Sequence, residues 1–463
     1  MNLKSNVEGI VWPNVQVGYA ATLMALQRQF EETQWLTSDE ILENQFKQLT
    51  VLANHATSIP FHEKNLKEAG FIKGKPMTLD IWKRLPILKR VDVRNLKGQL
   101  HAPSYPKFFG ESRIAYSGGS TGLPVGVKKS EMDSLIWESC HIRELIWNNV
   151  DEKKEVANFR GLRMELRDQA CNSPNTIIDK SGIVLGDWYP PASLITKTGR
   201  MGLIEPDLPL SEQADYVLRR KPSYLLMRPA GLRLLLSYFK EHNIKIDFIE
   251  SAWTLSELVD STLRDLCWDV LNCPIFNNYT SNETGYMALQ CPEGINHHVM
   301  SEAVYLEVID DNGNQCKAGE IGRVVVTPLH NFAMPLIRYE IGDEAEVGPP
   351  CSCGRGLLSL TRIVGRVEDY FLIKGEKRRF DLDHYKICDI EAVKEFQLIQ
   401  KTEDKLELHM VVSRPLNEDE LQRLNKVKRN SIARDLEWEF VFVDNIPRTA
   451  AGKLRQFISE VNI

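Results

Sequence analysis

The stretch FIESAWTLSELVDSTLRDLCWDVLNCPIFNNYT, residues 248–280, alternates between short strand-like runs and one long helix-like run. FIESAWT and PIFNNYT are short and rich in aromatic and β-branched residues, which favour strands. Between them, ELVDSTLRDLCWDVL places apolar residues at helical spacing. A strand, a helix and a second strand in this order predict parallel strands joined by a crossover helix.

The same alternation extends in both directions from this stretch. RIAYS leads through a Gly-rich turn into SLIWESCHIRELIWNNV, and PSYLLM precedes GLRLLLSYFKEHN. Residues from about 15 to 100 instead show the three- and four-residue spacing of helices, with Ser38 and Asp39 placed to begin one. From about 304, VYLEVIDDNGNQCKAGEIGRVVVTPL predicts an antiparallel hairpin region, and a short mixed α+β segment follows about 366. We therefore expect an α/β fold with a helical lead-in, a parallel-sheet core and a β-rich region.

Composition narrows the class of protein. Of 463 residues, 43% are hydrophobic and 26% charged, as in ordinary globular proteins. The 57 basic and 63 acidic residues give a net charge of −6, so no general attraction to nucleic acid or anionic lipid is expected. Nine cysteines, an odd number, favour thiols or a metal site in a reducing compartment. The N-terminus lacks the apolar core of a signal peptide and no segment can span a bilayer, so we expect a soluble cytoplasmic protein.

A Gly- and Ser-rich loop follows the predicted strand RIAYS. It reads YSGGSTGLPVGV over residues 116–127. Its glycines let backbone N–H groups approach an anion and its hydroxyls add donors, an array that suits a phosphate chain. No Gly-Lys-Ser/Thr sequence closes the loop, so it is not a Walker A motif. Taken alone, an ordinary Gly/Ser turn is the simpler interpretation.

Two further polar stretches lie at predicted strand ends, where ligands bind in open α/β sheets. In NYTSNETG, residues 278–285, Tyr279 could stack on a base and Glu283 could hold Mg²⁺. In RYEIGDEAEV, residues 338–347, Asp343 follows a glycine and could accept hydrogen bonds from both ribose hydroxyls. A polar loop and a β-turn aspartate are the alternatives.

The last two motifs are GRVEDYFLIKGEKRRF, residues 365–380, and IPRTAAGKLR, residues 446–455. Lys453 follows a glycine in a loop near the C-terminus. A lysine in a mobile loop can bring positive charge to a developing phosphoryl transition state and leave again. The alternative is a solvated basic turn.

The order of these five motifs resembles the adenylate-forming superfamily, which comprises acyl-CoA synthetases, luciferases and nonribosomal adenylation domains. The resemblance extends from about residue 15 to 455. Within the superfamily, the chain looks most like the phenylacetate–CoA ligase branch, with its coenzyme F390 synthetase and CapK-like relatives. IPFHEKNLKEAGF, LPILKRVDVRNL, CPEGINHHVMSEAVYLEVID and CSCGR carry this closer resemblance.

The resemblance implies a division of the chain and a role for each motif. Residues 1–365 would form an N-terminal adenylation domain, and residues 366–463 a small mobile C-terminal domain. The implied catalytic residues are Lys453, Glu283 and Arg366. The implied nucleotide-binding residues are Ser117, Gly118, Gly119, Ser120, Thr121, Gly122, Ser256, Glu257, Tyr279, Thr280, Ser281, Asp343 and Arg366. The chain departs from the family's pattern at Leu123, where many relatives have lysine, and at Thr280 and Asn282.

Cysteine and histidine spacing gives a separate signal. Cys291 and His298 are seven residues apart, and Cys351 and Cys353 form a Cys-x-Cys-Gly-Arg knuckle further on. Two thiolates one residue apart suit a tetrahedral Zn²⁺ site, although spacing alone leaves unrelated thiols equally open. Some relatives in the phenylacetate–CoA ligase branch carry zinc in this pattern, and their spacing favours His298 over His297. With no open coordination position, the metal would be structural.

The resemblance implies an AMP-forming acid–thiol ligase. ATP and Mg²⁺ would activate a small carboxylic acid, aromatic or not, as an acyl-AMP, and CoA would accept the acyl group. The alternative acceptor is an amine, as in polysaccharide or secondary metabolite biosynthesis, or a carrier-protein thiol. A remote alternative is a non-catalytic nucleotide-binding protein. We expect no nucleic-acid partner and no membrane insertion, and a homodimer is the family's common state. Arg228 in MRPAGL is either a contact for an acidic substrate or an ordinary surface residue.

Overall fold

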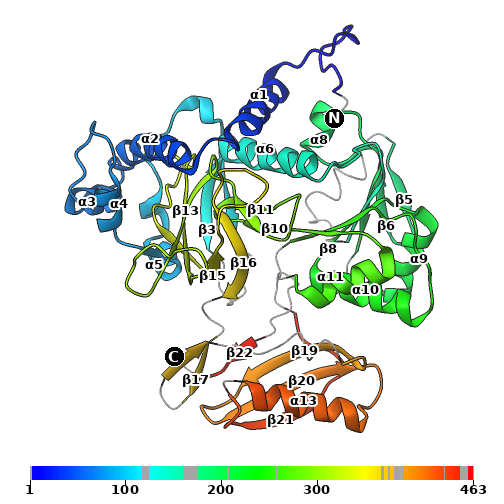
Figure 1. Ribbon diagram of the computed structural model, residues 1–463. Helices are drawn as coiled ribbons and strands as arrows, with labels where there is room; N and C mark the ends of the chain where they lie inside the picture. The colour runs from blue at the N-terminus through cyan, green and yellow to red at the C-terminus, as the bar shows by residue number, and fades with distance from the viewer. Residues whose placement is uncertain are drawn as a thin grey trace.

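The computed structural model of the protein (Figure 1) describes most of the chain. The described residues are 3–116, 125–159, 175–205, 208–255, 259–366, 370–373, 376–379, 387, 390–431, 433–448 and 457–461. Among them, no helix combines the length and the apolar character needed to cross a membrane.

The N-terminal part of the chain is helical, as predicted. Its helices are α1 (Gly18–Thr33), α2 (Ser38–Ala56), α3 (Pro60–Glu68), α4 (Leu79–Arg84) and α5 (Arg90–Leu96), with 3-10 turns η1 (Lys97–Leu100) and η2 (Lys107–Phe109). The N-cap of α2 is Thr37, whose side chain accepts from the N–H of Glu40 while the Glu40 carboxylate accepts from the N–H of Thr37. This capping box explains why the helix begins at Ser38.

One mixed sheet of 14 strands forms the centre of the molecule. In order across the sheet, its strands are β13 (Val304–Ile309), β14 (Ile321–Pro328), β15 (Tyr339–Val347), β16 (Ser359–Arg366), β12 (His297–Val299), β11 (Gly285–Gln290), β10 (Ile275–Ser281), β9 (Ser251–Leu255), β8 (Tyr224–Met227), β4 (Val156–Asn158), β7 (Met201–Ile204), β6 (Gly182–Leu185) and β5 (Ile177–Asp179), while β1 (Leu88–Lys89) pairs with β15. The run β10-β9-β8-β4-β7 is parallel, and β10 to β13 pair antiparallel through β11, β12, β16, β15 and β14. The predicted combination of a parallel core and a β-rich region is confirmed.

Helices cover both faces of the parallel strands. On one face lie α9 (Leu210–Arg220), α10 (Pro229–Glu241) and α11 (Ser261–Leu271), and on the other lies α6 (Glu131–Trp147), with the short α8 (Ala192–Ile195) close by (Figure 1). Consecutive residues of β9 point to opposite faces, so Ala252 packs in the core beneath α9–α11 and Trp253 in the core shared with α6. The segment between Ser251 and Ser281 therefore forms the β9-α11-β10 crossover that its sequence predicts.

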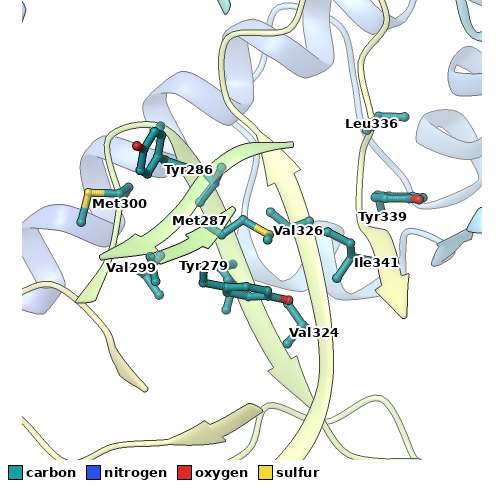
Figure 2. Close-up of a cluster of buried hydrophobic side chains, with 14 of the residues drawn as sticks. Tyr279, Tyr286, Met287, Val299, Met300, Val324, Val326, Leu336, Tyr339 and Ile341 are labelled. Carbon is teal, nitrogen blue, oxygen red and sulfur yellow. The ribbon is translucent and has the colours of Figure 1, made fainter. Parts of the chain in front are cut away.

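The β-rich region has its own apolar core. Tyr279 of β10 and Met287 of β11 lie among Val324, Val326 and Ile341 from β14 and β15 (Figure 2). All five residues are buried. The end of β10 is therefore held by strands that are distant in sequence.

The last part of the chain forms separate, smaller sheets. A hairpin of β17 (Tyr370–Ile373) and β18 (Glu376–Arg379) precedes a four-stranded sheet in the order β21 (Glu437–Phe442), β20 (Lys405–Val412), β19 (Val393–Gln400) and β22 (Phe457–Ser459), covered by α13 (Glu418–Asn430) (Figure 1). A core of Phe396, Leu408, Leu424 and neighbouring side chains joins this sheet to α13. The domain boundary expected between residues 365 and 366 stays a prediction, and it falls at the end of β16.

Candidate active site and metal centre

Two of the predicted motifs meet at a hydrogen bond between loops. The hairpin of β2 (Ser112–Tyr116) and β3 (Gly126–Ser130) brings both ends of the Gly/Ser-rich loop together. The Asn282 side-chain amide, in the NYTSNETG motif, donates to the Tyr116 carbonyl at 2.8 Å. The strand that enters the candidate phosphate loop is therefore fixed against the turn that follows β10.

Two further motifs meet across the sheet. The Tyr279 hydroxyl on β10 donates to Asp343 Oδ2 on β15 at 2.7 Å, although the two residues are 64 positions apart. Asp343 in turn stands opposite Arg366 in the pairing of β15 with β16. Tyr279 and Asp343 thus lie together with β16, the strand that carries Arg366. The resemblance predicts an adenosine site at this place.

Glu283 lies in the turn after β10 and is almost fully buried. Its Oε1 accepts from Arg90 Nη1 at 2.7 Å, at the start of α5. Burial opposes the charge of Arg90, but Tyr339 and Glu283 outweigh it and raise the pKa of Arg90, so the guanidinium stays charged. Glu283 Oε2 makes no hydrogen bond with any residue in the described ranges, which leaves one carboxylate oxygen for a cation.

The turn that presents Glu283 is shaped by its own hydroxyls. Ser281 Oγ accepts from the Thr284 N–H at 3.0 Å and lies 2.8 Å from the Thr284 hydroxyl. The pairing of β10 with β11 shifts register between Tyr279 and Thr280, and Thr280 stands opposite Tyr286. Such an irregularity re-aims the side chains at the end of a strand.

Several predicted site residues lie outside the described residues. These are Ser117, Gly118, Gly119, Ser120, Thr121, Gly122, Ser256, Glu257 and Lys453, and of Arg366 the structure describes the backbone.

Four side chains predicted as metal ligands come together at the ends of β11, β12 and β16. The ligand atoms of Cys291, His298, Cys351 and Cys353 all lie within 4.8 Å of one another. Cys291 Sγ is 3.9 Å from Cys351 Sγ, and Cys353 Sγ is 3.2 Å from His298 Nε2. A tetrahedron with zinc–sulfur bonds of about 2.3 Å has edges of roughly 3.5–3.8 Å, so this donor set fits Zn²⁺.

The protonation and orientation of His298 suit a ligand. Burial lowers the pKa of His298 to about 4, so its imidazole is neutral at pH 7, the form that binds a metal. The indole of Trp147 packs edge-on against the His298 ring at 5.8 Å between centroids. His297, the other histidine considered, precedes it in β12 and is not part of the four-residue cluster.

Arg355, the arginine of the Cys-x-Cys-Gly-Arg knuckle, packs against two tryptophan rings. The Arg355 guanidinium lies 4.7 Å from the Trp35 ring and 4.6 Å from the Trp147 ring, between the ends of α1 and α6. Its Nε donates to Gln34 Oε1 at 2.8 Å. The candidate metal centre therefore links the helical lead-in to the β-rich half of the sheet.

Two groups near the site were not assigned from the sequence. Arg90 belongs to LPILKRVDVRNL, a stretch that carries the family resemblance without a role of its own. Glu144 of α6 forms a buried hydrogen-bonded cluster with His141 and Tyr286. Nothing local in the sequence marks the partners of Glu144 on other elements.

Comparison with known proteins bears out the resemblance. A family model of the CapK C-terminal domain matches residues 382–460. Protein CapK of Staphylococcus aureus is 25% identical over 232 residues, 48% of this chain, and the match spans 50% of the length of CapK. The phenylacetate-coenzyme A ligase of Thermus thermophilus is 22% identical over 439 residues, which cover 86% of this chain and 92% of that ligase.

Solved structures share the fold. 2-Hydroxyisobutyryl-CoA ligase in its postadenylation state, bound to R3-HIB-AMP, gives a TM-score of 0.69 at 16% identity, over 90% of this chain and 89% of that one. The same ligase in its thioesterification state, bound to 2-HIB-AMP and CoA, gives a TM-score of 0.57. The chain is thus a sequence relative of CapK and of phenylacetate–coenzyme A ligase, and its fold is that of the adenylate-forming CoA ligases.

Proposed function

We propose that the protein activates a small carboxylic acid with ATP, forming an acyl-AMP and pyrophosphate, and then transfers the acyl group to the thiol of CoA. The observation that carries the proposal is the convergence of four motifs that are distant in sequence. They are brought together near the end of β10 by two hydrogen bonds, Asn282–Tyr116 and Tyr279–Asp343, and by the pairing of Asp343 with Arg366.

The chemistry needs positioning and charge stabilisation more than covalent help from the protein. A carboxylate is a poor acyl donor until its oxygen is joined to AMP. In the proposed site, Tyr279 and Asp343 hold the adenosine, and the loop of residues 117–122 holds the phosphates. Lys453 supplies positive charge to the transition state.

In the proposed site, Mg²⁺ binds the second oxygen of the Glu283 carboxylate. Glu283 keeps one oxygen on Arg90, while its other oxygen has no hydrogen-bond partner among the described residues. A bound Mg²⁺ would offset negative charge on the phosphates. The role of Arg90 is to hold the Glu283 carboxylate in place.

The proposed zinc site is structural. Three thiolates and a neutral imidazole complete a tetrahedron and leave no open position for a substrate. Its place beside Arg355, Trp35 and Trp147 supports a role in joining α1 and α6 to the end of β16. The expected stoichiometry is one zinc per chain.

Pyrophosphate release tests the proposed function. Purified protein is incubated with ATP and Mg²⁺ and a panel of aromatic, fatty, hydroxy and amino acids, each with and without CoA. Release that requires an acid, together with AMP formation that requires CoA, supports the proposal and gives the substrate class. Release with an acid but unchanged by CoA favours an amine or carrier-protein acceptor. The absence of release with every acid, joined to a failure to bind ATP, contradicts the proposal and favours a binding protein.

A further inference from the structure

A cavity of about 340 Å³ lies between α3, α5 and the chain that precedes β15. Figure 1 shows α3 and α5 on the opposite side of the large sheet from α9–α11. The walls of the cavity are mostly apolar and include Leu66, Leu85, Leu88 and Ile337. Its volume falls at the lower end of the roughly 300–1,000 Å³ that is usual for small-molecule sites.

Two stretches of the closer family resemblance build this cavity. Every described residue that lines it, except Ile337, belongs to IPFHEKNLKEAGF (59–71) or LPILKRVDVRNL (85–96). The proposed reaction uses Arg90 of these stretches, and Arg90 is not among the described lining residues. The cavity is therefore a feature that the proposed reaction does not account for.

A buried histidine gives the cavity a hydrogen-bond acceptor. His62 is 3% exposed, and its Nε2 lies 2.9 Å from the carbonyl oxygen of Pro335. A carbonyl can only accept, so Nε2 carries a proton. Burial lowers the pKa of His62 to about 4, so the ring is neutral at pH 7 and Nδ1 keeps its lone pair. Nδ1 makes no hydrogen bond with any residue that the structure describes.

Three further polar side chains line the same cavity. Asp92 Oδ2 accepts from the N–H of Lys89 at 3.0 Å, at the start of α5. Within the described ranges, Asp92 Oδ1 and the side-chain amides of Asn65 and Asn95 make no hydrogen bond. No lysine or arginine is among the described lining residues. The cavity therefore offers acceptors and one negative charge inside apolar walls.

This charge selects against the ligands of the proposed reaction. ATP, CoA and a carboxylic acid are all anions, which the Asp92 carboxylate would repel and no lining cation would attract. A protonated amine has the opposite chemistry, because an ammonium group has three donors and no acceptor. It can donate to Asp92 Oδ1 and to His62 Nδ1 at once, while an apolar body covers the leucines.

We propose that the cavity between α3 and α5 is a binding site for a small primary amine with an apolar body. The inference goes beyond the proposed function and does not depend on it. The ammonium group lies against Asp92 and His62, and the apolar body lies against Leu66, Leu85 and Ile337.

Three ligands with the same ring test the charge preference: benzylamine, benzyl alcohol and benzoate. Calorimetric titration of the full chain at pH 7 without ATP should show saturable binding of benzylamine with a Kd of roughly 1 mM or below. Benzyl alcohol should compete with benzylamine about tenfold more weakly, since hydrogen bonds to charged groups are the stronger ones. Benzoate should not displace benzylamine, even if it binds elsewhere as a substrate.

Two variants locate the bound amine. Asp92→Asn removes the charge but keeps an oxygen that can accept from the Lys89 N–H. It should weaken benzylamine about tenfold and leave benzyl alcohol unchanged within about threefold. Ile87→Trp fills the cavity from its half-buried wall and should abolish the binding of both. Asp80→Asn, in the first turn of α4 and outside the cavity, is the matched control and should bind benzylamine as the wild type does.

Three results would overturn the inference. The first is the absence of saturable binding up to about 10 mM benzylamine, tenfold above the expected Kd. The second is displacement of benzylamine by benzoate, or equal affinities for the amine and the alcohol. The third is unchanged benzylamine binding in Asp92→Asn or Ile87→Trp, which would place the amine elsewhere. Because binding is measured without ATP, failure of the pyrophosphate assay leaves this inference standing, and its own failure leaves acid activation intact.

Discussion

The Arg90–Glu283 pair is the residue-scale feature that connects the helical lead-in to the proposed chemistry. Its two side chains are 193 positions apart and meet at 2.7 Å with little exposure to solvent. A carboxylate that is already paired with one cation can still ligate another through its second oxygen. Glu283 can therefore hold Arg90 through one oxygen and a metal ion through the other.

Glu283→Gln keeps the size of the side chain and removes its charge. We expect acyl-AMP formation to slow by roughly a hundredfold, as when one electrostatic contact to a transition state is lost. The Mg²⁺ concentration for half-maximal rate should also rise, because Mg²⁺ prefers carboxylate oxygen. Initial rates of pyrophosphate release across a Mg²⁺ series measure both. Glu346→Gln, which removes the carboxylate paired with Arg362 at 2.7 Å, is the control. An unchanged Mg²⁺ dependence in Glu283→Gln would contradict the assignment.

Sequence reasoning predicted those residues of the proposed site that stand in short motifs beside a strand end. Tyr279, Glu283 and Asp343 each occur beside a strand end and a turn, so their neighbourhood is visible in the sequence. Arg90 and Glu144 were not identified, because their partners come from other elements and only the fold brings them together. The prediction therefore named the groups that would touch the substrate and missed the groups that hold them.

At the scale of elements, a buried ion pair fastens the lead-in to the sheet. Glu307 of β13 accepts from Arg338 Nη2 at 3.0 Å and from Arg338 Nε at 3.2 Å. The indole N–H of Trp82, from α4, donates to the same carboxylate at 3.0 Å. Arg338 also donates to the carbonyls of Lys83 and Leu85, so the end of α4 is bound to the residue that precedes β15.

Glu307→Leu should therefore be strongly destabilising. It leaves Arg338 buried without its carboxylate, and breaking one side of a buried pair costs about 3–5 kcal/mol. Asp269→Asn, which removes the exposed partner of Lys240, should cost at most about 1 kcal/mol. Urea unfolding followed by circular dichroism compares the two. Similar free energies of unfolding for both variants would show that the Glu307 pair does not hold the lead-in.

The proposed zinc site would be a second link between elements, and Cys353→Ser tests it. We expect the zinc content to fall below one per chain. Zinc affinity should drop by more than the roughly 10–100-fold that follows loss of an outer-shell partner, because Cys353 is a direct ligand in the proposed site. Because Trp35 and Trp147 flank Arg355 beside the knuckle, tryptophan fluorescence should change as well. Cys316→Ser removes a buried thiol outside the cluster and should alter neither signal. Absence of zinc from wild-type protein purified without chelator would contradict the site.

The elements themselves were predictable to different degrees. The β9-α11-β10 crossover could be predicted because one continuous stretch contains both strands and the helix. The single large sheet could not, because it depends on pairing such as that of His297 with Leu360 between β12 and β16. No local pattern specifies which of two distant strands will be neighbours.

At the scale of the whole molecule, the C-terminal sheet and the large sheet are separate bodies with separate apolar cores. The family resemblance predicts that the C-terminal part of the chain moves between the two half-reactions, which would place Lys453 at the site in the first and away from it in the second.

Lys453→Ala tests that movement because it should affect the two half-reactions unequally. Acyl-AMP formation from acid and ATP should slow by roughly a hundredfold or more, on the scale of one lost charge contact to the transition state. Thioester formation from supplied acyl-AMP and CoA should be far less affected, since the lysine would have left the site. Quenched-flow or discontinuous assays measure each step separately. Lys401→Ala, which removes the partner of Glu460 in the C-terminal sheet, should leave both steps unchanged. Equal losses in both half-reactions would show that Lys453 stays at the site throughout, and the C-terminal part would then act as a fixed lid.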